Sequence, residues 1–150
     1  MNLGAYLEPI PFREGTYRQN GFEFRLEPGP EDERWTVHNH LYGAAPTYDF
    51  GLDYALSDFW PRCEWLQTSP DSGFVRTTVC QRFTPESILT LRGAVFKTLA
   101  LEGASQHVLK TEEEYKTAMA EVFGLEVDTS KLWPRVWARH LDWVRSQEAI

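Results

Sequence analysis

The sequence predicts an α+β protein, in which antiparallel strands lie on both sides of a helical segment. Apolar and polar residues alternate along 22–26 and 35–42, which is the pattern of strands with one buried face. Residues 74–83 and 88–100 are rich in apolar and β-branched side chains, which also favours strands. A helix is expected after residues 111–114, where a capping sequence precedes apolar residues at helical spacing.

The two alternating runs in the N-terminal part predict a pair of antiparallel strands. The run at 35–42 places His38 and His40 together on one face, and the acidic residues 30–33 are expected to form the hairpin loop before it. An isolated hairpin is marginal in water and leaves unpaired backbone groups on both edges. We therefore expect a segment outside this chain to complete the sheet.

The middle of the chain predicts a helical connector. Residues 52–66 carry apolar side chains at spacings near four, and Pro61 is expected to interrupt or kink the helix because proline lacks a backbone N–H. A turn at 68–73 then leads into an antiparallel hairpin formed by residues 74–83 and 88–100. We expect this hairpin to belong to a sheet of three or four strands.

The C-terminal part predicts two helices. Thr111 and Glu114 have the spacing of a capping box, and the helix that follows is expected to stop at Gly124 and to pack on the sheet. Residues 132–143 mix tryptophans with arginines at helical spacing after Pro134. This last segment is interpreted as a docking helix.

Composition and charge narrow the possible functions. The 150 residues carry a formal net charge of -7, with a sequence pI of about 5.1, so neither nucleic acid nor an anionic membrane surface is an expected partner. No basic segment leads into an apolar run near the N-terminus, and no window is long and apolar enough for a membrane span. A cytoplasmic protein is therefore expected.

The sequence offers few candidate catalytic or metal-binding groups. It contains no phosphate-binding glycine loop, no nucleophile elbow and no zinc-protease motif. His38 and His40 share a strand face, but no third ligand stands at a fixed spacing, so we expect two solvated histidines and no metal site.

The two cysteines leave one catalytic alternative open. Cys63 lies in the expected connector helix and Cys80 in an expected strand, positions that favour packing as reduced thiols. A cysteine nucleophile needs a histidine base, and such groups assemble in space rather than in sequence. An independent catalyst would therefore combine either cysteine with one of the four histidines, His38, His40, His107 and His140.

Residues 65–75 carry a specific resemblance to a known family. Their sequence, Trp-Leu-Gln-Thr-Ser-Pro-Asp-Ser-Gly-Phe-Val, closely resembles the segment of arylamine N-acetyltransferases that joins the second and third domains. Residues 8–12 resemble the stretch that follows the family's Asp-x-Gly-Phe-Gly motif, and residues 24–26 resemble its next strand. The resemblance extends over roughly residues 5–127, about the second half of a family member.

Two segments of the third domain agree as well. Thr84-Pro-Glu followed by Leu91-Arg-Gly resembles the hairpin of that domain, and residues 110–125 resemble its late helix. The resemblance implies a cysteine-protease-like acetyltransferase fold with three parts. These are a partial antiparallel β-barrel over residues 1–51, a helical connector over 52–73, and an α/β third domain with a helical tail over 74–150.

The resemblance also implies a chemistry. In this family a cysteine thiolate, activated by a histidine that an aspartate orients, takes acetyl from acetyl-CoA and gives it to an arylamine or hydrazine in a ping-pong reaction. No metal is implied. The three catalytic groups belong to segments upstream of the part that this chain resembles, so the chain is expected to be the C-terminal portion of such an enzyme and inactive alone.

The expected site residues line the coenzyme cleft. The resemblance places Phe74 against CoA, with Asp71, Ser72 and Gly73 beside it, in positioning roles rather than in chemistry. Phe74 is alternatively a core residue that anchors the hairpin, and Asp71 and Ser72 are alternatively ordinary turn residues. A different function also stays open, in which the chain is a non-catalytic module that pairs with a separate N-terminal half.

Overall fold

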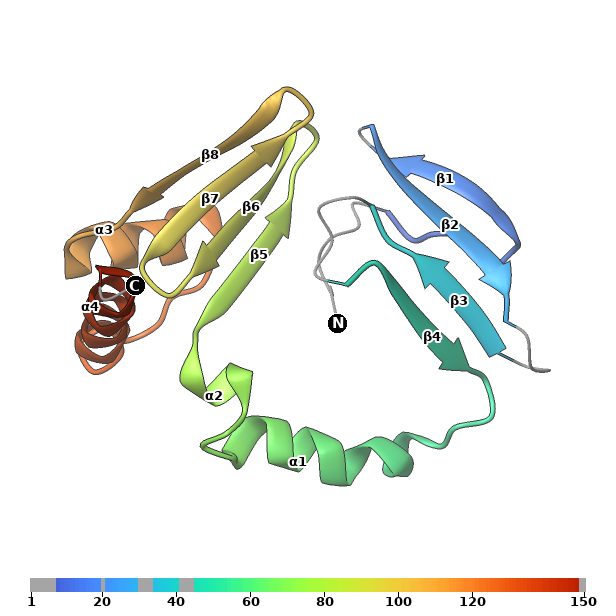
Figure 1. Cartoon of the computed structure of the whole chain (residues 1–150), viewed down its shortest axis with the longest axis horizontal. Helices are drawn as coiled ribbons and strands as arrows, with labels where there is room; N and C mark the ends of the chain where they lie inside the picture. The colour runs from blue at the N-terminus through green and yellow to red at the C-terminus, as the bar shows by residue number, and fades with distance from the viewer. Residues whose placement is uncertain (1–7, 20, 30–33, 41–44, 149–150) are drawn as a thin grey trace.

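The computed structural model contains two four-stranded antiparallel sheets joined by a helical connector, with further helices beside the second sheet (Figure 1). This arrangement confirms the predicted α+β class. The structure describes residues 8–19, 21–29, 34–40 and 45–148.

The first sheet has twice the number of strands that the sequence predicted. Its strands pair in the order β1-β2-β3-β4. They are β1 (Gly15–Gln19), β2 (Phe22–Pro28), β3 (Arg34–His38) and β4 (Thr47–Gly51). The hairpin of β2 and β3 was predicted, although its loop at 30–33 lies outside the described residues.

Strands that the sequence did not predict lie on both sides of this hairpin, and the expectation that a segment outside this chain completes the sheet stays a prediction. β1 pairs with β2 and β4 pairs with β3, so strands of this chain flank the hairpin on both sides. Both strands are short and carry polar residues such as Arg18 and Asp49, which weakens their apolar alternation. The described strands form an open sheet rather than a closed barrel.

The helical connector differs from the prediction in where its helix begins. A short 3-10 turn, η1 (Leu56–Phe59), precedes α1 (Trp60–Thr68), and Pro61 lies in the first turn of α1. Proline does not break a helix there, because the first N–H groups of a helix have no intrahelical acceptor. The prediction that Pro61 interrupts the helix was therefore wrong.

The second sheet pairs in the order β5-β6-β7-β8. Its strands are β5 (Val79–Phe83), β6 (Ser87–Arg92), β7 (Val95–Ala100) and β8 (Gly103–Val108). The run 74–83 was predicted as one strand, but it begins with the short helix α2 (Gly73–Arg76). The run 88–100 contains β6 and β7, which a tight turn separates at Gly93, whose φ of 56° suits glycine.

The helices of the second sheet follow the predicted pattern. Thr111 and Glu114 form a capping box at the start of α3 (Glu112–Thr117), which continues as the π-helical turn η2 (Ala118–Val122) and ends before Gly124, with φ 68°. The C-terminal helix α4 spans Trp133–Glu148. These helices share one core with the sheet, formed by the buried residues Leu91, Ala94, Leu109, Tyr115, Ala118, Met119 and Val136.

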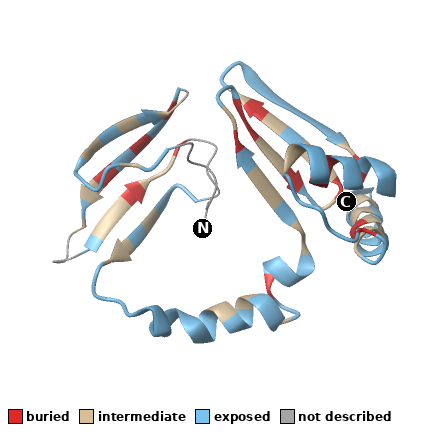
Figure 2. Ribbon diagram, turned by 180° about the vertical axis from the view of Figure 1, so that it is seen from behind, coloured by how far each residue is buried: buried red, intermediate tan, exposed pale blue. Residues whose placement is uncertain are grey.

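The two sheets meet through a second buried cluster. Phe22 and Phe24 of β2 pack against Phe83, Ile88 and Leu99 of the second sheet, and the rings of Phe22 and Phe83 are 5.6 Å apart in an edge-to-face arrangement. Figure 2 shows buried positions in both sheets, whereas α1 is largely exposed. The sheets thus touch near one end, and the connector joins them at the other end (Figure 1).

Candidate functional site

The predicted coenzyme-site residues lie at the junction of α1 and α2. Ser72 is fully buried and caps α2: its Oγ accepts from the Phe74 N–H at 3.2 Å and donates to the Leu66 carbonyl at 2.6 Å. The same hydroxyl therefore ties the end of α1 to the start of α2. Ser72 fixes the backbone of this junction, and it is more than an ordinary turn residue.

Phe74 projects from that fixed backbone into the open. Its side chain is 66% exposed, so the alternative that it anchors the hairpin as a core residue was wrong for this chain. A Cβ added at Gly73 would meet no atom within 4 Å, so the backbone beside Phe74 is also accessible. An exposed aromatic on a rigid turn is suited to contact a ligand or another protein surface.

Asp71 is held by a partner that the sequence did not indicate. Its carboxylate accepts from Arg76 Nη2 at 2.9 Å, and Arg76 Nε donates to the Pro70 carbonyl at 3.0 Å. Both side chains are exposed, so the pair adds little stability but closes the loop around Gly73. Outside a regular helix or strand, a spacing of five residues does not predict whether two side chains meet. No sequence pattern therefore predicts the contact between Asp71 and Arg76.

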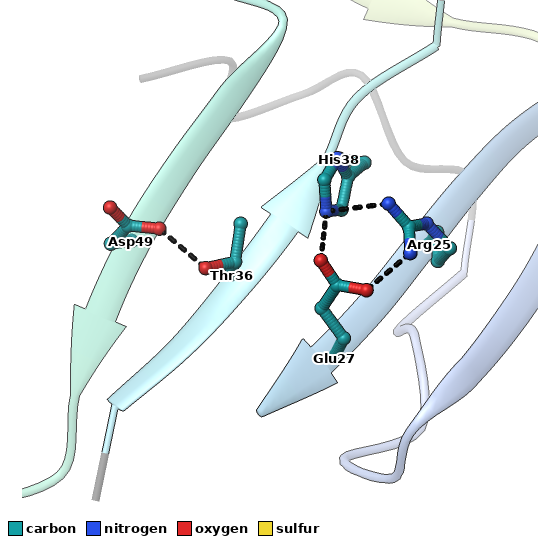
Figure 3. A network of polar contacts seen from close by, with 5 residues as sticks. All are labelled: Arg25, Glu27, Thr36, His38 and Asp49. Atoms are coloured by element: carbon teal, nitrogen blue, oxygen red, sulfur yellow. Dashed lines mark hydrogen bonds and ion pairs between the residues drawn. The ribbon is translucent and has the colours of Figure 1, made fainter. Parts of the chain in front are cut away.

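A polar network lies on the exposed face of the first sheet (Figure 3). Glu27 accepts from His38 Nε2 at 2.5 Å and is paired with Arg25, while Thr36 donates to Asp49 at 2.7 Å on the neighbouring strands. The hydrogen bond from His38, with the charge of Arg25, lowers the pKa of Glu27 below its ordinary value. The network links adjacent strands, as cross-strand pairs do.

The two histidines of the predicted strand face do not lie together. His38 joins Glu27, but β3 ends at His38, and His40 is buried with its ring 4.9 Å from Phe22 and 5.3 Å from Phe24. The expectation of two solvated histidines on one face was wrong, because strand alternation holds only as far as the strand does. In the described ranges, no group of three or more His, Cys, Asp or Glu could hold a metal ion.

Neither cysteine has the surroundings of a nucleophile. Cys80 Sγ lies 3.5 Å from Met119 Sδ in the core, and burial raises the pKa of its thiol. A nucleophilic thiol needs the opposite shift. Cys63 is half-buried in α1, and in the part of the chain that the structure describes neither thiol is hydrogen-bonded to a histidine.

The comparisons with known proteins agree with this fold. Residues 3–132 match the family model described as N-acetyltransferase. The chain therefore belongs to the N-acetyltransferase family, and the resemblance to the arylamine N-acetyltransferases is confirmed. Among curated proteins no significant match was found.

Solved arylamine N-acetyltransferases have similar structures. The enzyme from Salmonella typhimurium matches 91% of this chain and 54% of its own, with a TM-score of 0.70 and 21% identity. The Nocardia farcinica enzyme matches 88% and 48%, with a TM-score of 0.63 and 25% identity. The Mycobacterium marinum enzyme in complex with CoA matches 85% and 49%, with a TM-score of 0.69 and 16% identity.

The matches cover only part of each solved enzyme. The chain spans about half the length of the solved structures, so the groups that perform the reaction in those enzymes need not lie in the matched part. Among the described residues, no helix combines the length and the apolar composition needed to cross a membrane.

Proposed function

We propose that this chain is the C-terminal portion of an arylamine N-acetyltransferase and supplies one wall of its coenzyme site. In the complete enzyme, acetyl passes from acetyl-CoA to a cysteine thiolate and then to an arylamine or hydrazine. The family match over residues 3–132 and the solved relative that contains CoA support this proposal. The cytoplasmic location expected from the sequence stays a prediction.

The observation that carries the proposal is the exposed Phe74 on a turn that is held from within. Ser72 is buried and fixes the turn through two hydrogen bonds, and Asp71 and Arg76 close it from outside. A flexible loop loses conformational entropy when a ligand orders it. A turn that is already fixed in the free protein avoids this loss on binding. The exposure of Phe74 and the open backbone at Gly73 support the proposal that this turn contacts the coenzyme.

The chemical step requires groups from elsewhere. Cys80 is buried and its pKa is raised, and Cys63 has no histidine bound to it among the described residues. We therefore propose that the nucleophilic cysteine, the histidine base and the orienting aspartate come from an N-terminal half that this chain does not include. The role of the chain itself is to bind and orient the coenzyme.

Coenzyme binding and turnover test this proposal separately. The 150-residue chain is titrated with acetyl-CoA by calorimetry, and Phe74→Ser is expected to weaken binding by about tenfold because an aromatic contact is lost. Phe59→Ser, at another exposed aromatic in η1, is the matched control and leaves the affinity unchanged. Equal affinity of Phe74→Ser and the native chain would remove Phe74 from the site.

The turnover assay mixes the chain with acetyl-CoA and an aromatic amine and follows the release of the CoA thiol. No release above the uncatalysed rate is expected from the chain alone. Turnover that Cys63→Ala abolishes would overturn the proposal and restore an independent cysteine catalyst.

A second candidate function is a non-catalytic module that pairs with a separate N-terminal half. The observation in its favour is the apolar surface of the connector, where α1 has no buried residue. The exposed apolar side chains there are Leu52, Tyr54, Leu56, Phe59, Trp60 and Trp65. Several large apolar side chains exposed within one short segment favour an interaction surface.

The mass of the protein in its source distinguishes the two functions. A mass well above 17.4 kDa for the single polypeptide, with an N-terminal extension carrying a cysteine, supports the enzyme. A polypeptide of 17.4 kDa that copurifies with a second chain supports the paired module.

A further inference from the structure

The open face of the second sheet and the helix α4 form a groove that no comparison assigns. Its volume is about 1060 Å³, which is at the upper end of the range of small-molecule sites. One wall comes from β5 to β8, another from α4, and the residues 75–78 that follow Phe74 close one side. Helix α4 begins at Trp133 and so lies beyond the family match, which ends at residue 132.

The groove is lined by basic side chains. Arg92 and Lys97 reach it from the sheet, Arg135 and Arg139 reach it from α4, and Arg76 lies at its side. None of the described residues that line it is acidic. In a chain with 22 acidic and 15 basic residues, such a concentration of one sign does not follow from composition.

The four cations other than Arg76 are unpaired within the described part of the chain. No ion pair or side-chain hydrogen bond joins Arg92, Lys97, Arg135 or Arg139 to another described residue. Arg135 and Arg139 are four residues apart on one helix, a spacing at which like charges destabilise the helix. A bound anion would remove this repulsion and satisfy the guanidinium donors.

An aromatic side chain adds information about the ligand. Trp143 lines the same groove, is 56% exposed, and lies one turn of α4 beyond Arg139. An exposed indole beside several cations suits a ligand that carries both phosphate groups and a planar base. Gln81, Thr90 and Gln106 contribute neutral polar groups to the floor of the groove.

We propose that this groove binds a phosphorylated nucleotide, with Arg135 and Arg139 on its phosphates and Trp143 against its base. Arg92 and Lys97 contact the same phosphates from the sheet. The adenosine 3′,5′-bisphosphate end of coenzyme A has this chemistry, and the groove adjoins the turn that carries Phe74. That choice of nucleotide rests on the proposed function, whereas the anion site rests on the groove itself.

Calorimetric titration of the 150-residue chain with adenosine 3′,5′-bisphosphate tests the proposal. Arg135→Gln/Arg139→Gln is expected to raise the Kd by about tenfold or more, since two charge-assisted contacts are lost. Lys110→Gln/Lys116→Gln removes the same charge at exposed positions outside the groove and is expected to leave the Kd unchanged. Equal weakening by both double variants, or no binding by the native chain, would overturn the site.

A second double variant shows whether weaker binding results from misfolding, and a second probe separates the contribution of the phosphates from that of the base. Arg92→Gln/Lys97→Gln changes the sheet wall instead of α4 and is expected to weaken binding similarly. Inorganic pyrophosphate should bind more weakly than the nucleotide, and Trp143→Leu should reduce that difference. Equal affinity for the two probes in the native chain would overturn the nucleotide assignment.

Comparison of acetyl-CoA with adenosine 3′,5′-bisphosphate tests whether the nucleotide in the groove is part of coenzyme A. Phe74→Ser should weaken acetyl-CoA but not adenosine 3′,5′-bisphosphate, which lacks the pantetheine arm. Arginine-dependent binding of the bisphosphate together with no binding of acetyl-CoA would refute the proposed function while the nucleotide groove stands. Binding of acetyl-CoA without binding of the bisphosphate would refute the nucleotide site in the groove while the proposed function stands.

Discussion

At the scale of single residues, the candidate site depends on one buried hydroxyl. Ser72 makes two hydrogen bonds within the turn, and it is fully buried. Its neighbour Phe74 is exposed and contributes little to folding. The residue that positions the site and the residue that is proposed to contact the ligand are thus two positions apart in the chain and have different roles.

Ser72→Ala should lower the free energy of unfolding by about 1–2 kcal/mol, because the helix cap and the bond to the Leu66 carbonyl are both lost. Ser105→Ala, at an exposed position of β8, is the control and should change stability little. Urea denaturation followed by circular dichroism measures both. A smaller loss for Ser72→Ala than for Ser105→Ala would contradict this account of the turn.

His40 should make stability depend on pH. Burial lowers the pKa of His40 below its ordinary value of 6.5, so the folded protein favours the neutral ring. As the pH falls below 6.5, the unfolded chain takes up a proton that the folded chain resists, and the free energy of unfolding decreases. His40→Phe should therefore reduce the stability loss between pH 7.5 and pH 5.5, measured by urea denaturation.

The control for this pH effect is His107→Gln, which changes an exposed histidine of β8. It should retain the full loss of stability of the native chain over the same interval. If His40→Phe and the native chain lose the same free energy of unfolding, another group causes the pH dependence.

At the scale of elements, the capping box is the clearest case in which sequence and structure agree. Thr111 Oγ1 accepts from the Glu114 N–H at 3.2 Å, and Glu114 Oε2 accepts from the N–H groups of Thr111 and Lys110. The cap matters because α3 places Tyr115 in the core, where it is fully buried. A frayed first turn would loosen that contact.

Thr111→Ala should cost about 1 kcal/mol of stability, the usual effect of losing an N-terminal cap. Thr117→Ala makes the same substitution at an exposed position inside α3, where alanine has the higher helix propensity, and should be neutral or slightly stabilising. Thermal unfolding of the two variants compares them directly. Equal destabilisation would show that the threonine side chain, rather than its capping position, is responsible.

At the scale of the whole molecule, the two sheets are coupled through aromatic rings. Phe22 and Phe83 lie at 5.6 Å edge to face, and both are buried. Phe22→Leu and Phe83→Leu should show a coupling energy of about 0.5–1.5 kcal/mol in a double-mutant cycle. Chemical denaturation of the native, single and double variants provides the four values.

The control cycle combines Phe22→Leu with Phe96→Leu. Phe96 packs in the core of α3 and α4 rather than at the contact between the sheets, so the two changes should be additive. Additivity in the Phe22 and Phe83 cycle as well would contradict an energetic coupling of the sheets through this ring pair.

The sequence alone determined the features that depend on near neighbours in the chain. Strand alternation predicted β2 and β3, the spacing of Thr111 and Glu114 predicted the start of α3, and residues 65–75 indicated the family. The weaker alternation of β1 and β4 does not predict a strand, and Pro61, expected to interrupt or kink the helix, lies in its first turn instead. The first error missed two whole strands, and the second misjudged where a helix begins, a boundary that local patterns define poorly.

The tertiary structure decided what requires distant residues to meet. It separated His38 from His40, left Phe74 exposed, and brought arginines of α4 beside the cations of β6 and β7. Burial and electrostatic surroundings depend on which faces pack together, and no spacing along the chain encodes that choice. The family could therefore be recognised from the sequence, while the basic groove became visible only in the folded chain.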